Sequence, residues 1–289
     1  MASGQQQPPA EPAQQPAPAP AQQPAPPPAQ QPKPAAARAQ AVPYYDTSDG
    51  FFSLAGYYWF TKDSLTMYTG DAAPAGQAPS DLHYPGKTNY TPGVIVSFPA
   101  GANNCIRASY FRTTGSGTTV ADKALNFFGT DYPAGTQLNP SYTLQNVKLS
   151  LDFLSWPFPL EDRRFRFKTL WEVQYTSIQT TIHAPALEAA DSTLNPAVKT
   201  NWFIYPSFGV GIEEMLSKHA RFEGKASGFG LPGHSTLWDA EGELAYKMGA
   251  IEIFAGGKAF HFKTSPGQEN YVFATLSGAF AGIRWYPKF

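Results

Sequence analysis

The most constraining feature of this sequence is a regular alternation of apolar and charged residues along two long runs within Tyr142–Ile182. In the first run, the apolar residues Val147, Leu149, Leu151 and Phe153 alternate with Asn146, Lys148, Ser150 and Asp152. In the second run, the apolar residues Phe165, Phe167, Trp171, Val173 and Tyr175 alternate with Arg164, Arg166, Lys168, Glu172, Gln174 and Thr176. A period of two predicts β-strands with one apolar face and one charged face.

These strands are unusual in their length and in the polarity of their second face. They run for about ten residues or more, whereas strands of soluble proteins usually have about five or six. A strand with an apolar outer face and a charged inner face suits a closed barrel that crosses a bilayer. The alternative is a soluble all-β binding protein, but long strands with charged inner faces would leave such a fold without an apolar core.

Composition narrows the possibilities further. The net charge of −1 gives no electrostatic argument for nucleic acid as a partner. No run approaches the roughly 18 apolar residues of a membrane helix. Cys105 is the single cysteine, so an intrachain disulfide is impossible. Aromatic residues reach 15%, which a membrane barrel would explain through rings placed at the two interfaces.

The N-terminal part of the chain has low complexity. Three octads follow one another, QQPAPAPA, QQPAPPPA and QQPKPAAA, and such a composition cannot bury a core. We therefore predict that residues 1–43 are a disordered Pro/Gln/Ala-rich linker, with possible cell-wall contact. The opening MASGQQQPPA has neither the basic nor the apolar part of a secretory signal. A barrel in a bacterial outer membrane needs a secretory signal. We therefore expect that the signal has been removed or that translation starts elsewhere.

Residues 44–289 read as a series of strands joined by alternately long and short connections. We predict strands at Phe51–Thr61, Pro92–Phe98, Cys105–Arg112, Tyr142–Leu154, Arg164–Ile182, Asn201–Met215, Ala220–Leu231, Leu237–Met248, Ala250–Lys263 and Tyr271–Trp285. The predicted fold is all-β, a closed antiparallel up-and-down transmembrane β-barrel of about 10 strands (8–12). Short connections are typical of the periplasmic side of such barrels and long ones of the outer side, which puts both termini in the periplasm.

The C-terminal GIRWYPKF, with Trp285 and the terminal Phe289, resembles the C-terminal signature of Gram-negative outer-membrane β-barrels. The family prefers an apolar or aromatic residue two positions before the end, where this chain has Pro287. The resemblance implies location in the outer membrane, recognition by the outer-membrane assembly machinery, and contact with membrane lipid and lipopolysaccharide. Independently, amphipathic rings near strand ends predict a membrane-interface girdle, formed by Trp59, Trp156, Trp202, Trp238 and Trp285.

The charges of the predicted inner face form the main functional hypothesis. They are Arg107, Lys148, Asp152, Arg164, Arg166, Lys168, Glu172, Glu213, Arg221, Glu223, Lys225, Asp239, Glu241, Glu243, Lys247, Glu252 and Lys258. A barrel of eight to ten strands has a lumen little wider than its side chains. Paired charges would therefore plug it, and the alternative is a narrow channel. If the lumen is plugged, a structural or surface-interaction role follows, because loops on a rigid scaffold commonly contain binding sites.

An enzymatic alternative rests on the loop around His234 and Ser235, with Asp239 nearby. Ser, His and a carboxylate at the rim resemble the outer-membrane lipid A deacylases, which would make the chain a hydrolase. In that family the His and the Ser stand two apart, whereas His234 and Ser235 are adjacent and face opposite sides of an extended chain. We therefore predict no catalytic residue, and the sequence indicates no cofactor and no metal-ligand spacing.

Overall fold

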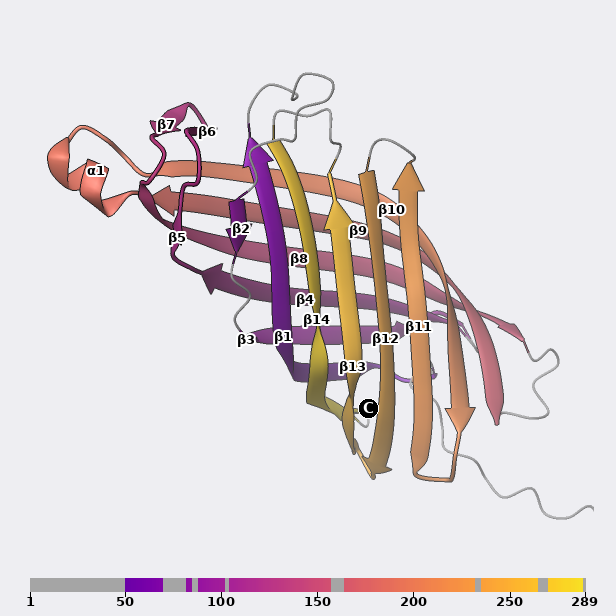
Figure 1. Cartoon of the computed structure of the whole chain (residues 1–289). Helices are drawn as coiled ribbons and strands as arrows, with labels where there is room; N and C mark the ends of the chain where they lie inside the picture. Colours follow the sequence, from indigo (N-terminus) through magenta and orange to yellow (C-terminus); the bar gives the residue numbers. More distant parts are fainter. Residues whose placement is uncertain are drawn as a thin grey trace, which may run out of the picture. The chain divides into compact units, whose positions relative to one another are not determined.

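The computed structural model describes residues 50–69, 82–84, 88–101, 104–156, 164–231, 235–264 and 270–287. Ten long antiparallel strands follow one another around a sheet that closes on itself (Figure 1). They are β1 (Ser53–Thr69), β3 (Thr88–Pro99), β4 (Cys105–Ser116), β8 (Gln137–Trp156), β9 (Phe165–His183), β10 (Ala197–Met215), β11 (Ala220–Leu231), β12 (Ser235–Met248), β13 (Ile251–Lys263) and β14 (Asn270–Trp285). The predicted ten-stranded barrel is confirmed, strand by strand.

Closure is made by the first and last strands. β1 and β14 pair antiparallel from Leu54–Trp285 to Thr69–Asn270. Gly278 lies inside this seam, where a Cβ would collide with the backbone carbonyl oxygen of Phe60. A residue without a side chain is therefore required for the two backbones to approach here.

Two tight connections mark one end of the barrel, which we call the turn end; the opposite end is the loop end. One connection joins β10 to β11, where the Leu216 and Ser217 N–H groups donate to the Ala220 carbonyl at 3.0 and 3.1 Å. The other joins β12 to β13 through Gly249, whose φ of +63° is in the region that favours glycine. The predicted alternation of long and short connections holds from β1 to β11, but it fails at the loop end between β11, which ends at Leu231, and β12, which begins at Ser235.

The outer wall is apolar over most strands. Large exposed side chains face outward from consecutive strands, including Tyr58, Leu149, Leu151, Trp171, Val173, Phe208, Val210, Leu244, Ile253 and Ile283. A soluble protein rarely exposes such a continuous apolar surface. A closed sheet leaves no strand edge within this belt, so it satisfies the conditions for crossing a bilayer.

The lumen is divided into two zones. Charged residues fill the half nearest the turn end, and an apolar core occupies the half nearest the loop end. The apolar core contains Trp59, Phe111, Leu144, Ile178, Leu237, Phe260, Phe262 and Leu276. Every one of these side chains follows the same inward alternation as the charges.

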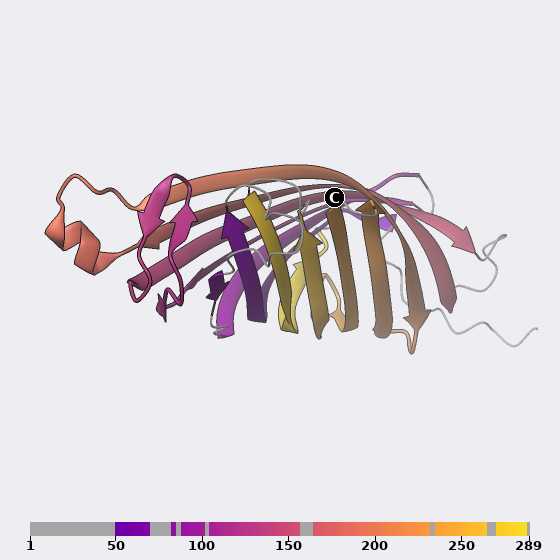
Figure 2. The ribbon, with the colours of Figure 1, turned by 45° about the horizontal axis from the view of Figure 1, so that its top comes forward.

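Shorter elements lie at the loop end. They are β2 (Leu82–Tyr84), β5 (Thr119–Val120), β6 (Leu125–Phe127), β7 (Thr130–Tyr132) and the helix α1 (Pro185–Ala190). In Figures 1 and 2, α1, β6 and β7 gather at the far ends of the long strands β8, β9 and β10. Within the part of the chain that the structure describes, no helix is long and apolar enough to cross a membrane. The predicted linker, residues 1–43, lies outside the described residues.

Candidate functional site

The charged zone of the lumen is the candidate site. Its basic side chains are the eight buried residues Arg107, Lys148, Arg166, Lys168, Arg221, Lys225, Lys258 and Arg284. Its acidic side chains are the eight residues Asp152, Glu172, Glu213, Glu223, Asp239, Glu241, Glu243 and Glu252, of which Glu241 is half-buried and the rest are buried. The formal charges of this network therefore cancel.

Arg221 on β11 is the centre of the network and is wholly buried. Its Nη1 lies 3.3 Å from Glu213 Oε1 and 2.6 Å from Glu223 Oε2. Its Nη2 lies 3.2 Å from Glu243 Oε1 and 2.9 Å from Glu252 Oε1. These carboxylates belong to β10, β11, β12 and β13. One guanidinium thus links four consecutive strands through charge-assisted hydrogen bonds.

Arg284 on β14 extends the network toward the turn end. Its guanidinium pairs with Glu252 and, at 3.2 Å, with Glu243 Oε1. The Tyr286 hydroxyl donates to Glu252 Oε2 at 3.1 Å, and Lys247 Nζ lies 4.3 Å from the centre of the Tyr286 ring. A cation this close to an aromatic face is held by the ring quadrupole. These groups line the turn-end mouth of the lumen.

Other ion pairs cross the lumen instead of following the wall. Lys148 on β8 lies 2.6 Å from Asp239 on β12, and Lys225 on β11 lies 2.7 Å from Asp152 on β8. β8 is not a neighbour of β11 or β12 in the sheet. A cavity among these residues has a volume of about 10 Å³, which is close to the space that a single water needs. The side chains therefore occupy the lumen at this level.

Aromatic rings cover the charged zone on its loop-end side. Lys258 Nζ lies 5.9 Å from the ring centres of Tyr57, Trp59 and Phe111. Phe111 then makes edge contacts with Trp59 at 5.5 Å and with Phe260 at 5.4 Å between ring centres. Such edge-to-face pairs add to the stabilisation from burial alone. The lumen is thus filled by ions and then by rings.

A smaller polar group lies beyond the rings. Asp63 on β1 accepts hydrogen bonds at Oδ2 from the Asn89 amide, at 2.6 Å, and from the Tyr142 hydroxyl. Tyr142 can reach Asp63 because the facing residue on β4 is Gly115, whose Cβ would strike the Tyr142 ring. Among the described residues, no partner contacts Asp63 Oδ1 or the buried Thr113 hydroxyl. Buried polar atoms without a protein partner are commonly met by water.

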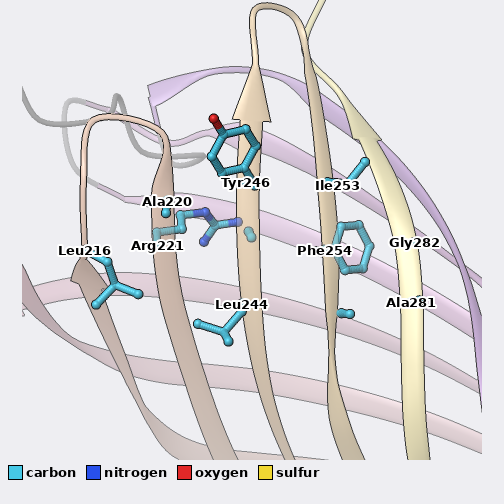
Figure 3. Close-up of a pocket in the computed structure, with 11 residues that line it drawn as sticks. Leu216, Ala220, Arg221, Leu244, Tyr246, Ile253, Phe254, Ala281 and Gly282 are labelled. Carbon is cyan, nitrogen blue, oxygen red and sulfur yellow. The ribbon is translucent and has the colours of Figure 1, made fainter.

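The outer wall carries a groove near the turn end (Figure 3). Leu216, Leu244, Tyr246 and Ile253 line it. Its volume of about 580 Å³ is within the range of small-molecule sites, roughly 300–1,000 Å³. All four side chains are exposed on the outward face of the sheet. A second groove of about 440 Å³ lies on the outer wall beside Trp171.

Comparison with solved structures identifies the fold. The outer-membrane protease OmpT of Escherichia coli superposes with a TM-score of 0.55 at 8% identity, over 83% of this chain and 98% of OmpT. The chain folds as a Gram-negative outer-membrane β-barrel. No protein-family model and no curated protein matches the sequence.

Two further solved structures match this chain with lower TM-scores. Ail of Yersinia pestis, an attachment invasion locus protein, gives a TM-score of 0.37 at 7% identity over 81% of this chain and 99% of Ail. AlkL gives 0.31 at 12% identity over 86% of this chain and 97% of AlkL. At 8% identity, the similarity to OmpT concerns the fold alone. That fold agrees with the location predicted from the sequence.

The fold defines the two sides of the outer-membrane barrel. Short turns are periplasmic and longer loops are extracellular in such barrels. By this rule we expect the turn end with Ser217 and Gly249 to be the periplasmic end, and α1, β6 and β7 to lie on the extracellular side. There, the Thr193 hydroxyl at 2.7 Å and its backbone N–H at 2.9 Å donate to Asp191. These two hydrogen bonds lower the pKa of the exposed Asp191 carboxyl.

The structure brings together all the charges predicted for the lumen except Arg164 and Lys247. Arg164 precedes β9 and its side chain is 59% exposed, 3.8 Å from the exposed Glu214. The prediction that it faces the lumen is wrong, because the strand alternation begins only at Phe165. Lys247 is half-buried at the periplasmic mouth. Arg284 was missed, although its inward position follows from continuing the alternation of Phe280 and Gly282 on β14.

Among the aromatic residues predicted for the membrane interface, Trp59 is misplaced. Its side chain is fully buried in the lumen, and its Nε1 donates to the Gly278 carbonyl at 3.3 Å. Both faces of this part of β1 carry aromatic residues, so composition could not decide which faces inward. The other four predicted interface residues, Trp156, Trp202, Trp238 and Trp285, are exposed. Trp202 lies on the part of β10 that extends beyond its pairing with β11. Phe289 lies outside the described residues.

The residues of the hydrolase hypothesis that the structure describes, Ser235 and Asp239, do not form a catalytic group. Asp239 is a lumen residue that pairs with Lys148. The Ser235 side chain lies beside the Tyr205 hydroxyl, and His234 lies outside the described residues. His261 faces the outer wall, where it stacks on Trp238 at 5.4 Å between ring centres. Among the described residues, no group of three or more His, Cys, Asp or Glu is placed to hold a metal ion.

Proposed function

We propose that this outer-membrane barrel is a plugged membrane anchor that holds an interaction surface outside the cell. The observation that carries the proposal is the pair of ion contacts that cross the lumen, Lys148–Asp239 and Lys225–Asp152. A conducting pore needs a continuous polar path. Here the path is interrupted first by these ion pairs and then by the aromatic layer around Trp59.

The balance of charge supports the same function. Eight basic and eight acidic side chains neutralise one another in the network, so no excess of one sign remains to select permeating ions. Ion pairs that satisfy each other across the lumen favour a rigid barrel over a ligand pocket. The long extracellular ends of β8, β9 and β10 then have a stable base, and α1 and the β6–β7 hairpin lie at those ends.

Conductance in planar bilayers tests the proposal. We expect the purified barrel to give no discrete ion-dependent steps, under conditions in which a porin in the same bilayer conducts. Reproducible steps that change size with the ion would overturn the plugged anchor and support the narrow channel instead. Insertion must be verified in the same samples by heat-modifiable migration on a detergent gel.

The partners predicted from the sequence are proposals of the same kind. The apolar outer wall is suited to membrane lipid and lipopolysaccharide, and the C-terminal Trp285 to the assembly machinery. A cell-wall contact would be made by the Pro/Gln/Ala-rich linker. Loss of detergent-extractable barrel from the envelope when Trp285 is replaced by Ala would support recognition of this residue during assembly.

A further inference from the structure

The extracellular half of β10 is paired on one side only. β10 pairs with β9 along Ala197–Glu214, but with β11 only along Phe208–Met215. Within the described strands, nothing pairs with the other side of β10 before Phe208. At its start the Ala197 backbone lies beside the Tyr132 hydroxyl. We call the remaining unpaired side, from Val198 to Tyr205, the free edge.

The free edge faces away from the cell. In Figures 1 and 2, the first half of β10 forms the upper border of the long strands β8–β10, opposite the tight turns. Those turns are periplasmic. Two copies in one membrane would therefore both direct their free edges outward and could not pair edge to edge. An occupant must come from the extracellular side.

The chemistry of the free edge identifies that occupant as a polypeptide. A strand edge presents N–H and C=O groups in alternation, and another extended backbone satisfies them best. Proteins usually protect such edges with charges, prolines or a covering element. Here Pro206 lies just beyond the free edge, Lys199 is the one charge within it, and Trp202, Ile204 and Val198 are 61%, 59% and 50% exposed.

We propose that the free edge binds an extended segment of an extracellular polypeptide, which adds to β10 as a further antiparallel strand. The segment carries apolar side chains beside Trp202 and Ile204 and an acidic side chain opposite Lys199. Specificity comes from these alternate side chains, while the backbone hydrogen bonds supply affinity. This inference rests on the proposed surface-interaction role and names the partner class for it.

A synthetic peptide with the sequence of residues 172–182, EVQYTSIQTTI, is a suitable probe. In the barrel this β9 sequence already pairs with residues 197–207, with Ile182 opposite Ala197 and Thr180 opposite Lys199. β9 already protects every second amide of this stretch. We therefore expect fast hydrogen exchange in the free barrel at the alternate amides of Val198–Tyr205 that point away from β9, and slower exchange there when the peptide is added. A peptide with Glu at the Thr180 position should bind about two- to five-fold more tightly than one with Lys there.

Two controls make the experiment decisive. The same peptide with alternate amides N-methylated should not bind, because it cannot form the edge hydrogen bonds. Trp202→Glu should weaken binding of the Glu peptide, whereas Val120→Glu should not, since the exposed Val120 lies on β5, which pairs with β8. Heat-modifiable migration confirms that both variants fold.

Three results would overturn the inference. The free barrel could show the free edge as protected as Phe208–Glu214, or the N-methylated peptide could bind as well as the parent. Clustering of two vesicle populations by the barrel alone would identify a second copy as the occupant. None of these results produces conductance steps, so failure of the free edge is distinguishable from failure of the plugged anchor.

Discussion

Replacing Arg221 tests whether the lumen network stabilises the barrel. Arg221→Ala would remove the one guanidinium that contacts all four buried carboxylates, those of Glu213, Glu223, Glu243 and Glu252. Breaking a buried ion pair by removing one member costs about 3–5 kcal/mol, because the remaining charge stays buried. Lys168, Lys225 and Arg284 still neutralise part of the charge, so we expect a loss within that range and not four times as large.

Urea unfolding followed by tryptophan fluorescence measures this loss. With a denaturant slope of about 2 kcal/mol per M, a loss of 3–5 kcal/mol lowers the urea midpoint by roughly 1.5–2.5 M. Arg164→Ala is the matched control, since this exposed arginine faces Glu214 at 3.8 Å and such a pair contributes about 0–1 kcal/mol. If the two variants unfold at the same midpoint, the network does not stabilise the barrel in the way we argue.

A double-mutant cycle separates the network from simple loss of packing. Glu252 pairs with Arg221 at 2.9 Å and also with Arg284. Combining Arg221→Met with Glu252→Gln removes one positive and one negative charge together. The loss in the double variant should therefore be smaller than the sum of the single losses, by roughly 0.5–3 kcal/mol. Additive losses would show that the charges act independently.

Three further predictions use other parts of the barrel. Gly278→Ala should lower the free energy of unfolding or prevent barrel closure, because the added Cβ would collide with the Phe60 carbonyl. Gly257→Ala on the neighbouring strand is the control. Its Cβ would meet nothing within 4 Å, so this variant should be near neutral in the same urea titration. In variants with a single tryptophan, brominated lipid should quench Trp171, which is 57% exposed on the outer wall, but not Trp59 in the lumen; equal quenching would contradict the placement of Trp59. Gly115→Ala should displace the Tyr142 ring from Asp63 and lower the urea midpoint, whereas Gly56→Ala, with open space at its Cβ, should leave it unchanged.

The alternation of β8 and β9 carried most of the fold prediction. Lys148, Asp152, Arg166 and Glu172 each have apolar neighbours on both sides, so polarity alone assigned the inner face. β1 offered no such contrast, because Tyr57, Tyr58, Trp59 and Phe60 are aromatic on both faces. Only the register with β14 and β3 shows that Tyr57 and Trp59 point inward. Sequence patterns therefore predicted the barrel but not the aromatic layer within it.

The ion pairs across the lumen could not be predicted for a related reason. Alternation places Lys148 and Asp239 on the inner face, but their contact depends on how far the strands are staggered around the barrel. The stagger is a property of the closed sheet, so it cannot be determined from the sequence of any single strand. The network was therefore predictable as a set of residues and as a balance of charge, while its individual partners were not.

The free edge shows where strand lengths become informative. The tight turn at Leu216 and Ser217 aligns the periplasmic ends of β10 and β11. Once those ends are aligned, the longer strand must extend past the shorter one on the extracellular side. β10 has 19 residues and β11 has 12, so an unpaired segment on β10 follows directly from the two lengths. The predicted strands, Asn201–Met215 and Ala220–Leu231, were too similar in length to show it, because the added residues Ala197–Thr200 are identified as strand only by their pairing with β9. A difference in length between two strands joined by a tight turn is thus itself a signal for an exposed edge, and in this barrel that edge faces the exterior.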